Sequence, residues 1–222
     1  MQRISVTLTW AQSLDGRIAT RTGDSQWISG DETLVLSQEL RKSHDAIAVG
    51  INTALRDDPL LTCRLPDCAN PLRVVFDSGL RLPPDSKLTA TAHETPTVVF
   101  CAPLSGLTTA GLERKSTLED LGIRVVALPP APSGGLSLKA ALESLRGSGV
   151  ASLMVEGGST LLTAFLKEGL ASRAVVVTAP IFIGSGIEAV GDLGTARLSD
   201  ALRPKKSSVR PMGADAVWEL EL

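Results

Sequence analysis

Short runs of Val, Ile and other apolar residues recur along this chain, separated by helical patterns and by Gly and Pro. Unbroken apolar runs are typical of strands buried on both faces of a mostly parallel sheet, and their alternation with helical patterns favours βα units over a β-sandwich. We therefore expect an α/β fold in which helices flank a mostly parallel central sheet. The predicted strands are Ile4–Ala11, Ala46–Gly50, Leu72–Phe76, Thr97–Phe100, Arg124–Leu128, Leu153–Val155, Ala174–Thr178, Ser207–Arg210 and Ala216–Leu222.

The turn sequence Pro211-Met212-Gly213-Ala214 separates the last two predicted strands and indicates an antiparallel C-terminal hairpin. The clearest predicted helix follows Ser29-Gly30-Asp31-Glu32, which has the spacing of a capping box, and it should run to about Ser43. Two more helices are predicted over Leu136–Arg146 and over Ser159–Glu168, where Gly169 closes the second. The stretch Ala102–Leu121 is polar and only weakly periodic.

A length of 222 residues without a long linker predicts a single domain over 1–222. The chain carries 22 basic and 24 acidic side chains, so it lacks the positive charge that nucleic-acid binding requires. Aromatic residues make up 3% of the chain and tyrosine is absent, which also disfavours a base-stacking surface. We expect no nucleic-acid partner.

The three cysteines, Cys63, Cys68 and Cys101, cannot all pair within the chain and lack C-x-x-C spacing, so a reducing compartment is the simpler interpretation. No apolar stretch approaches the roughly 18 residues that span a bilayer, and we expect a cytoplasmic protein without a membrane partner. His44 and His93 are isolated and no H-E-x-x-H motif is present. We expect no metal site, and an organic cofactor becomes the better hypothesis.

A double glycine is the strongest local motif. Leu153-Met154-Val155 leads into Glu156-Gly157-Gly158, and a helix is predicted from Ser159. Glycines let the backbone approach a ligand closely, and the free N–H groups at a helix N-terminus favour a phosphate. The alternative is a tight turn with Ser159 as the helix cap.

Two further segments are candidates. Ser13–Arg17 and Thr22–Trp27 form a long polar connection of the kind that is often functional, although it could equally be a solvated loop with Trp27 as a core anchor. Asn52–Arg64 follows a predicted strand, where ligands of open α/β sheets gather. Asp57 and Asp58 in this segment are either an acid pair or the end of a helix followed by a turn.

Taken together, these segments resemble the reductase domain of the riboflavin-biosynthesis deaminase/reductase, which has a dihydrofolate-reductase-like fold. The resemblance extends from near residue 4 to the C-terminus and is weak over Leu82–Val150. The motifs that carry it are Ser13-Leu14-Asp15-Gly16-Arg17, Gly23-Asp24-Ser25-Gln26-Trp27-Ile28, Asp57-Asp58-Pro59-Leu60-Leu61-Thr62 with Arg64, Phe76-Asp77-Ser78, Val155-Glu156-Gly157-Gly158 and Pro180-Ile181-Phe182-Ile183-Gly184-Ser185-Gly186.

The resemblance implies NADPH-dependent reduction of the ribosyl group of a phosphoribosylamino-pyrimidine to a ribityl group. It implies that the substrate is bound by Ser25, Arg41, Leu61, Arg64 and Glu156, and Arg41 and Arg64 suit a ribose 5′-phosphate. It implies cofactor contacts at Gln12, Trp27, Thr53, Asp57, Ser78, Gly157, Gly158, Ser159, Thr160 and Leu161, continuing to Ala164.

We further expect Asp57 to polarise or protonate the reacting region of the substrate. The resemblance suggests a homodimer and a deaminase that is a separate protein or a missing domain. The substrate could be the deaminated or the still-aminated pyrimidine. A pterin reductase of the same fold and a non-catalytic NADPH-binding module are the alternatives.

Overall fold

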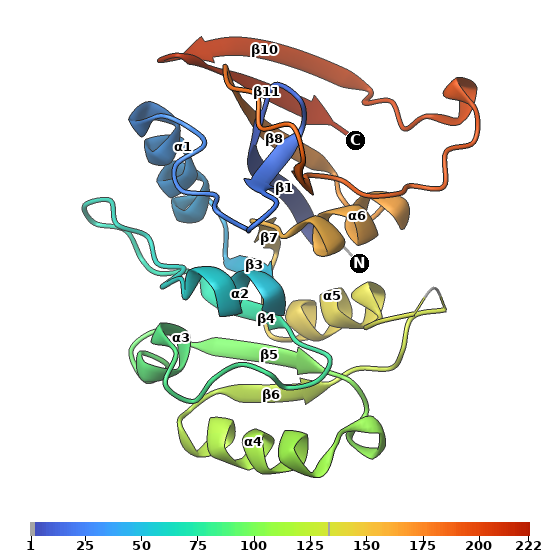
Figure 1. The fold of residues 1–222 in the computed structure, drawn as a ribbon. Coiled ribbons are helices and arrows are strands. Elements are labelled where there is room, and N and C mark those ends of the chain that lie inside the picture. Colours follow the sequence, from blue (N-terminus) through green and yellow to red (C-terminus); the bar gives the residue numbers. More distant parts are fainter. Residues whose placement is uncertain (1–2, 133) are drawn as a thin grey trace. The chain divides into compact units, whose positions relative to one another are not determined.

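The computed structural model describes residues 3–132 and 134–222, and the chain falls into two compact units (Figure 1). The first unit contains Arg41–Leu153 together with Arg3 and Ile4, and the second contains Ser5–Leu40 and Met154–Leu222. Strand β7 (Ser152–Val155) has residues in both. Whether 1–222 behaves as a single domain stays a prediction.

The first unit is built on four parallel strands, β3 (Ala46–Gly50), β4 (Leu72–Phe76), β5 (Thr97–Cys101) and β6 (Arg124–Ala127), paired in that order. Their carboxyl ends therefore share one edge. The central β5 is buried throughout, as its apolar sequence predicts. The other elements of this unit are α2 (Ile51–Asp57), α3 (Lys87–Ala90), η1 (Leu104–Gly106), α4 (Thr109–Asp120) and α5 (Leu138–Gly147).

A buried arginine holds the first unit together on the side opposite to these carboxyl ends. Arg73 lies at the start of β4 with 0% of its surface exposed, and its Nη1 donates to the Leu60 carbonyl at 3.2 Å. Its Nη2 donates to the Thr95 carbonyl at 2.7 Å, and its Nε donates to Thr97 Oγ1 at 2.9 Å. Burial lowers the pKa of Arg73 to about 10, yet the group stays charged and fully hydrogen-bonded at neutral pH.

The second unit contains both parallel and antiparallel pairs. β1 (Ser5–Ser13) is parallel to β8 (Arg173–Ala179), β8 is antiparallel to β11 (Asp215–Glu221), and β11 is antiparallel to β10 (Lys206–Met212). A two-stranded sheet joins β2 (Arg17–Thr20) to β9 (Gly186–Glu188). The remaining elements are α1 (Asp31–Lys42, of which Asp31–Leu40 lies in this unit), α6 (Ser159–Lys167) and η2 (Leu198–Asp200).

The structure confirms the α/β class, the mostly parallel pairing and the C-terminal antiparallel hairpin. Every predicted strand is present within a few residues of its expected bounds. One buried cluster in the core of the second unit contains Leu36, Leu40, Met154, Val175, Val177 and Val217.

Two elements differ from the expectation. The polar connection after β1 contains β2, which pairs with β9. Because β9 lies far along the chain, no local sequence pattern predicts this strand. The weakly periodic stretch contains α4, which is capped by Thr108, whose Oγ1 accepts from the Gly111 N–H at 3.1 Å.

The start of α1 also differs. The helix begins at Asp31, and it is Asp215 that accepts from the Gly30 N–H at 2.8 Å and from Thr33 Oγ1 at 2.9 Å. The capping box expected around Ser29 depends on local contacts alone, whereas the C-terminal hairpin brings a carboxylate to this helix end.

Candidate functional site

The double glycine forms the turn between β7 and α6, as predicted. Gly157 is buried and has a φ of +108°, a conformation that favours glycine, and the Gly157–Gly158 peptide bond is cis. Gly158 is the residue before the helix and offers no side-chain cap, so Ser159 is not the cap that the alternative interpretation required. The backbone N–H groups at this helix start are therefore suited to an anionic ligand.

Asp15 joins two of the motifs in the second unit. Its carboxylate accepts from Ser13 Oγ at 2.6 Å, from the Ile183 N–H at 3.1 Å and from the Gly184 N–H at 2.6 Å. These hydrogen bonds, that from Ser13 foremost, lower the pKa of Asp15 to about 2. Arg17 reinforces the junction through an ion pair with Glu188 at 2.8 Å.

The other predicted residues of the second unit lie in varied surroundings. Trp27 is 69% exposed, so it is not a core anchor and is open to a ligand. Gln12 is half-buried and its Oε1 accepts from Trp10 Nε1 at 2.7 Å. Glu156 is half-buried and accepts from Ser37 Oγ at 3.4 Å, and Ser25 is half-buried.

In the first unit, Thr53, Asp57 and Ser78 belong to segments that follow the carboxyl ends of β3 and β4. Arg81 ties these two segments together, because its Nη2 donates to Asn52 Oδ1 at 2.9 Å. Thr53 is half-buried and Ser78 is exposed. The shared edge of a parallel pair thus brings Thr53 and Ser78 to the same side of the sheet.

Asp57 and Asp58 have different surroundings. Asp57 is the last residue of α2 and is exposed at the surface, yet the protein atoms packed around its carboxyl group raise its pKa by desolvation. Asp58 adopts a left-handed conformation and accepts from the Lys87 N–H at 2.8 Å. The helix terminus followed by a turn is therefore correct, and Asp58 is a structural residue.

Asp77 supports the loop that presents Ser78. Its side chain is fully buried, its Oδ2 accepts from the Leu82 N–H at 2.8 Å, and burial raises its pKa. The Asp77 carbonyl accepts from the Leu80 N–H at 3.1 Å. Asp77 lies in the motif Phe76-Asp77-Ser78, for which no role of Asp77 was predicted. The signal that could have found it is a carboxylate directly after an unbroken apolar strand.

The predicted substrate segment lies between α2 and β4 in the chain. Arg41 is buried and its Nη1 donates to the Thr62 carbonyl at 2.9 Å. Leu61 is 1% exposed and belongs to the core of the first unit, so its surface is closed to a ligand in this structure. Arg64 is exposed.

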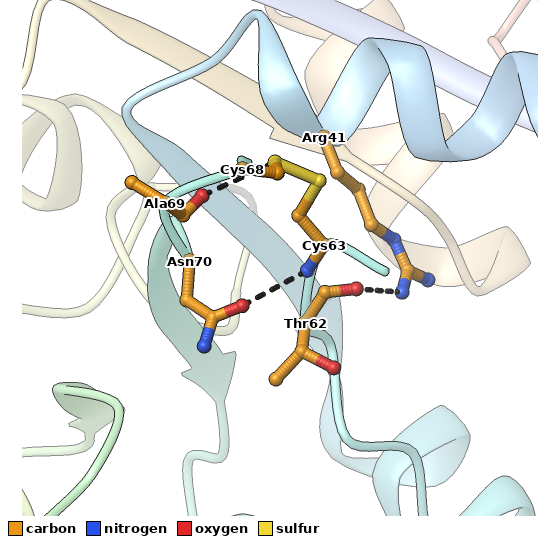
Figure 2. Close-up of a disulfide and its surroundings, with 6 residues drawn as sticks. All are labelled: Arg41, Thr62, Cys63, Cys68, Ala69 and Asn70. Atoms are coloured by element: carbon orange, nitrogen blue, oxygen red, sulfur yellow. Dashed lines mark hydrogen bonds between the residues drawn. A yellow bond between two sulfur atoms is a disulfide. The ribbon is translucent and has the colours of Figure 1, made fainter. Parts of the chain in front are cut away.

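The sequence excluded only the pairing of all three cysteines, and the structure pairs two of them. Cys63 and Cys68 form a disulfide with their Cα atoms 6.0 Å apart, and Cys101 is free and buried (Figure 2). The intervening chain reverses direction where Asp67 takes a φ of +53°, which allows two cysteines without C-x-x-C spacing to meet.

Across 3–132 and 134–222, no group of three or more His, Cys, Asp and Glu side chains is arranged to hold a metal ion. In the same part of the chain, no helix combines the length and the apolar character needed to cross a membrane.

The fold defines the class of the protein. It is shared with dihydrofolate reductase from Enterococcus faecalis, with a TM-score of 0.51 at 12% identity, covering 98% of this chain and 95% of that one. The fold class is therefore dihydrofolate-reductase-like α/β.

Within that class, the chain belongs to the RibD C-terminal domain family, whose model matches residues 4–218. The RibD structure from Acinetobacter baumannii has a TM-score of 0.83 at 27% identity, and the match covers 99% of this chain and 58% of that one. A Methanothermobacter thermautotrophicus protein named 2,5-diamino-6-ribosylamino-4(3H)-pyrimidinone 5′-phosphate reductase is 40% identical over 220 residues, 96% of each chain. The chain spans only 57% of the length of each of two curated relatives named RibD, from Aquifex aeolicus and Actinobacillus pleuropneumoniae.

Proposed function

We propose that this chain reduces the ribosyl group of a phosphoribosylamino-pyrimidine to a ribityl group in riboflavin biosynthesis, with NADPH as the reductant. The observation that carries this proposal is the match over 96% of the length of an archaeal reductase whose name specifies such a substrate. The substrate is that diamino-pyrimidinone or its deaminated counterpart, 5-amino-6-(5-phosphoribosylamino)uracil.

The cofactor assignment is supported by the geometry of the glycine turn. A buried Gly157 and an uncapped start of α6 leave backbone N–H groups for a diphosphate, which suits Gly157, Gly158, Ser159 and Thr160. The Leu161 N–H already donates to the Gly158 carbonyl at 2.9 Å, so the contact that we assign to Leu161 does not use this group. The exposed ring of Trp27 offers an apolar face. We assign the remaining cofactor contacts to Gln12, Thr53, Asp57 and Ser78. When bound, NADPH supplies the hydride that reduces C1 of the sugar.

The substrate assignment rests on the guanidinium of Arg64. This exposed group can bind the 5′-phosphate through paired hydrogen bonds. Arg41 donates a hydrogen bond to the carbonyl of Thr62, two residues before Arg64, and so fixes the backbone that leads into Arg64. Glu156 accepts hydrogen bonds from substrate donors, with Ser25 as a further contact. A contact at Leu61 stays a prediction, because this residue is 1% exposed.

Asp57 is the proposed proton donor. The nitrogen attached to C1 must hold a proton as C1 is reduced, and a carboxyl group whose pKa is raised keeps its proton to a higher pH. We therefore place Asp57 at that nitrogen.

The decisive experiment offers NADPH with each of the two pyrimidine substrates and with dihydrofolate, each separately, and follows the loss of NADPH absorbance. Turnover on at least one substrate is expected. NADPH binding without turnover on either would replace the proposal by a non-catalytic binding module, and turnover on dihydrofolate alone would indicate a pterin reductase.

We also propose that the protein is a cytoplasmic homodimer that acts in sequence with a deaminase. The exposed side chains of Val209 and Trp218 lie opposite each other on β10 and β11, and β10 has no neighbour on its other side within the second unit. An exposed edge with apolar side chains is suited to a second copy of the chain.

A further inference from the structure

The Cys63–Cys68 disulfide encloses the predicted phosphate-binding residue. The two cysteines are five residues apart in sequence, and Arg64 lies between them. Figure 2 shows the ring beside Arg41 and Thr62. The covalent ring therefore determines which conformations the backbone at Arg64 can adopt.

Both sides of this ring are attached to the body of the first unit. On one side, Arg41 Nη1 donates to the Thr62 carbonyl at 2.9 Å. On the other, the Cys63 N–H donates to Asn70 Oδ1 at 3.1 Å (Figure 2). Asn70 Nδ2 in turn donates to the buried Thr95 Oγ1 at 3.2 Å. The attachments position the base of the ring, whereas its tip, which includes Arg64, Pro66 and Asp67, is exposed.

This disulfide is poorly suited to stabilising the whole fold. Closing so short a loop removes less conformational entropy from the unfolded chain than closing a long one. Cys63 and Cys68 are each half-buried, so a reductant can reach them, whereas Cys101 is buried in the core. Disulfides of cytosolic proteins are usually redox-sensing or catalytic.

We propose that Cys63–Cys68 is a reversible redox element that controls the affinity for the phosphorylated substrate through Arg64, an inference that rests on the proposed function. A dithiol reductant supplies two electrons: its thiolate attacks one sulfur, the Cys63–Cys68 bond breaks, and both cysteines become thiols. The reductant leaves as a disulfide. Reoxidation by a disulfide-containing protein reverses the exchange.

The oxidised form holds Arg64 ready for the phosphate, and the reduced form must order residues 64–67 on binding. Ordering a loop on binding costs conformational entropy, and a loop that is already rigid in its bound conformation avoids this cost and binds more tightly. We therefore expect reduction to raise the substrate KM about threefold to tenfold. kcat and the KM for NADPH should change little, because no cofactor contact lies within the ring.

The test compares wild-type protein pre-oxidised or pre-reduced with dithiothreitol, alongside a Cys63→Ser/Cys68→Ser variant. The variant should show the reduced-state KM under both conditions, and Cys101→Ala should retain the wild-type response. If the serine variant folds poorly, reduced wild-type protein alkylated with iodoacetamide replaces it. Equal KM values in the two wild-type states, or a serine variant that still responds, would overturn the redox inference.

A second measurement separates this inference from the proposed function. Hydrogen exchange of residues 62–70 and binding of ribose 5-phosphate are followed in both redox states, independently of turnover. Faster exchange and weaker binding on reduction support the redox element even if no pyrimidine is turned over. Unchanged exchange and binding contradict it even in an active enzyme.

Discussion

The carboxylate of Asp15 accepts a hydrogen bond at 2.6 Å from the backbone N–H of Gly184, 169 residues further along the chain. This contact connects the loop after β1 to the segment before β9, and both segments contain motifs of the RibD C-terminal domain family. Asp15 is therefore a structural junction between these two segments.

We expect Asp15→Asn to destabilise the protein at neutral pH. The folded-state pKa of Asp15 is lowered from 3.8 to about 2, so the ionised carboxylate stabilises the folded state above about pH 4 and loses that effect as the pH falls toward 2. Thermal unfolding followed by circular dichroism should show a lower unfolding temperature for the variant, and its difference from wild type should narrow as the pH falls over this range. The exposed Asp85→Asn is the control, and a difference that is independent of pH would contradict the assignment.

Arg73→Met should lower the free energy of unfolding by about 3 kcal/mol, because it leaves several buried carbonyl groups without their donor. Urea denaturation measures the loss. Arg203→Met, at an exposed position, should change the free energy of unfolding by less than about 0.5 kcal/mol. Equal effects of the two substitutions would show that the Arg73 network is not a source of stability.

Asp57→Asn should lower kcat about 100-fold, the smaller end of the usual contribution of a general acid. Because Asp57 must be protonated to donate, the wild-type kcat should fall as the pH rises through its raised pKa, and the variant should lose this dependence. Asp58→Asn is the matched control, since Asp58 bonds to Lys87 and should leave the pH profile unchanged. Near-normal turnover by Asp57→Asn would leave Asp57 a binding or structural residue.

Gly186→Ala should weaken the pairing of β2 with β9. A Cβ atom at this position would collide with the carbonyl oxygen of Ala19, and such overpacking costs about 1–3 kcal/mol. Gly147→Ala, where the added Cβ meets no neighbouring atom, should be neutral or slightly stabilising. Chemical denaturation compares the two variants, and an unaffected Gly186→Ala would mean that the β2–β9 sheet shifts without cost.

Val209→Lys should convert the proposed dimer into a monomer, because it places a charge on the exposed strand β10, opposite Trp218 on β11. Light scattering after size-exclusion chromatography measures the mass. Ser208→Lys adds the same charge on the opposite face of the strand and should leave the dimer intact. A monomeric wild-type protein would contradict the proposal.

The strands could be predicted because burial on both faces leaves long apolar runs, as in Ala46–Gly50 and Leu72–Phe76, whose predicted bounds match the structure. Helix α4 was missed because its sequence has little apolar periodicity. Its contacts include the cap at Thr108 and a surface ion pair between Lys115 and Glu119, and such polar contacts leave no apolar pattern. The glycine turn was found because strand, glycines and helix start are contiguous.

By itself, the sequence determined the α/β class, the order of the strands along the chain and the family motifs, because apolar periodicity and turn residues act over short distances. Only the tertiary structure decided that Asp15 bonds to Gly184, that Asp215 lies at the start of α1, and that Cys63 pairs with Cys68. The first two contacts join residues far apart in sequence, and the third depends on a chain reversal at Asp67. Their energies come from folded geometry, which local sequence patterns do not record.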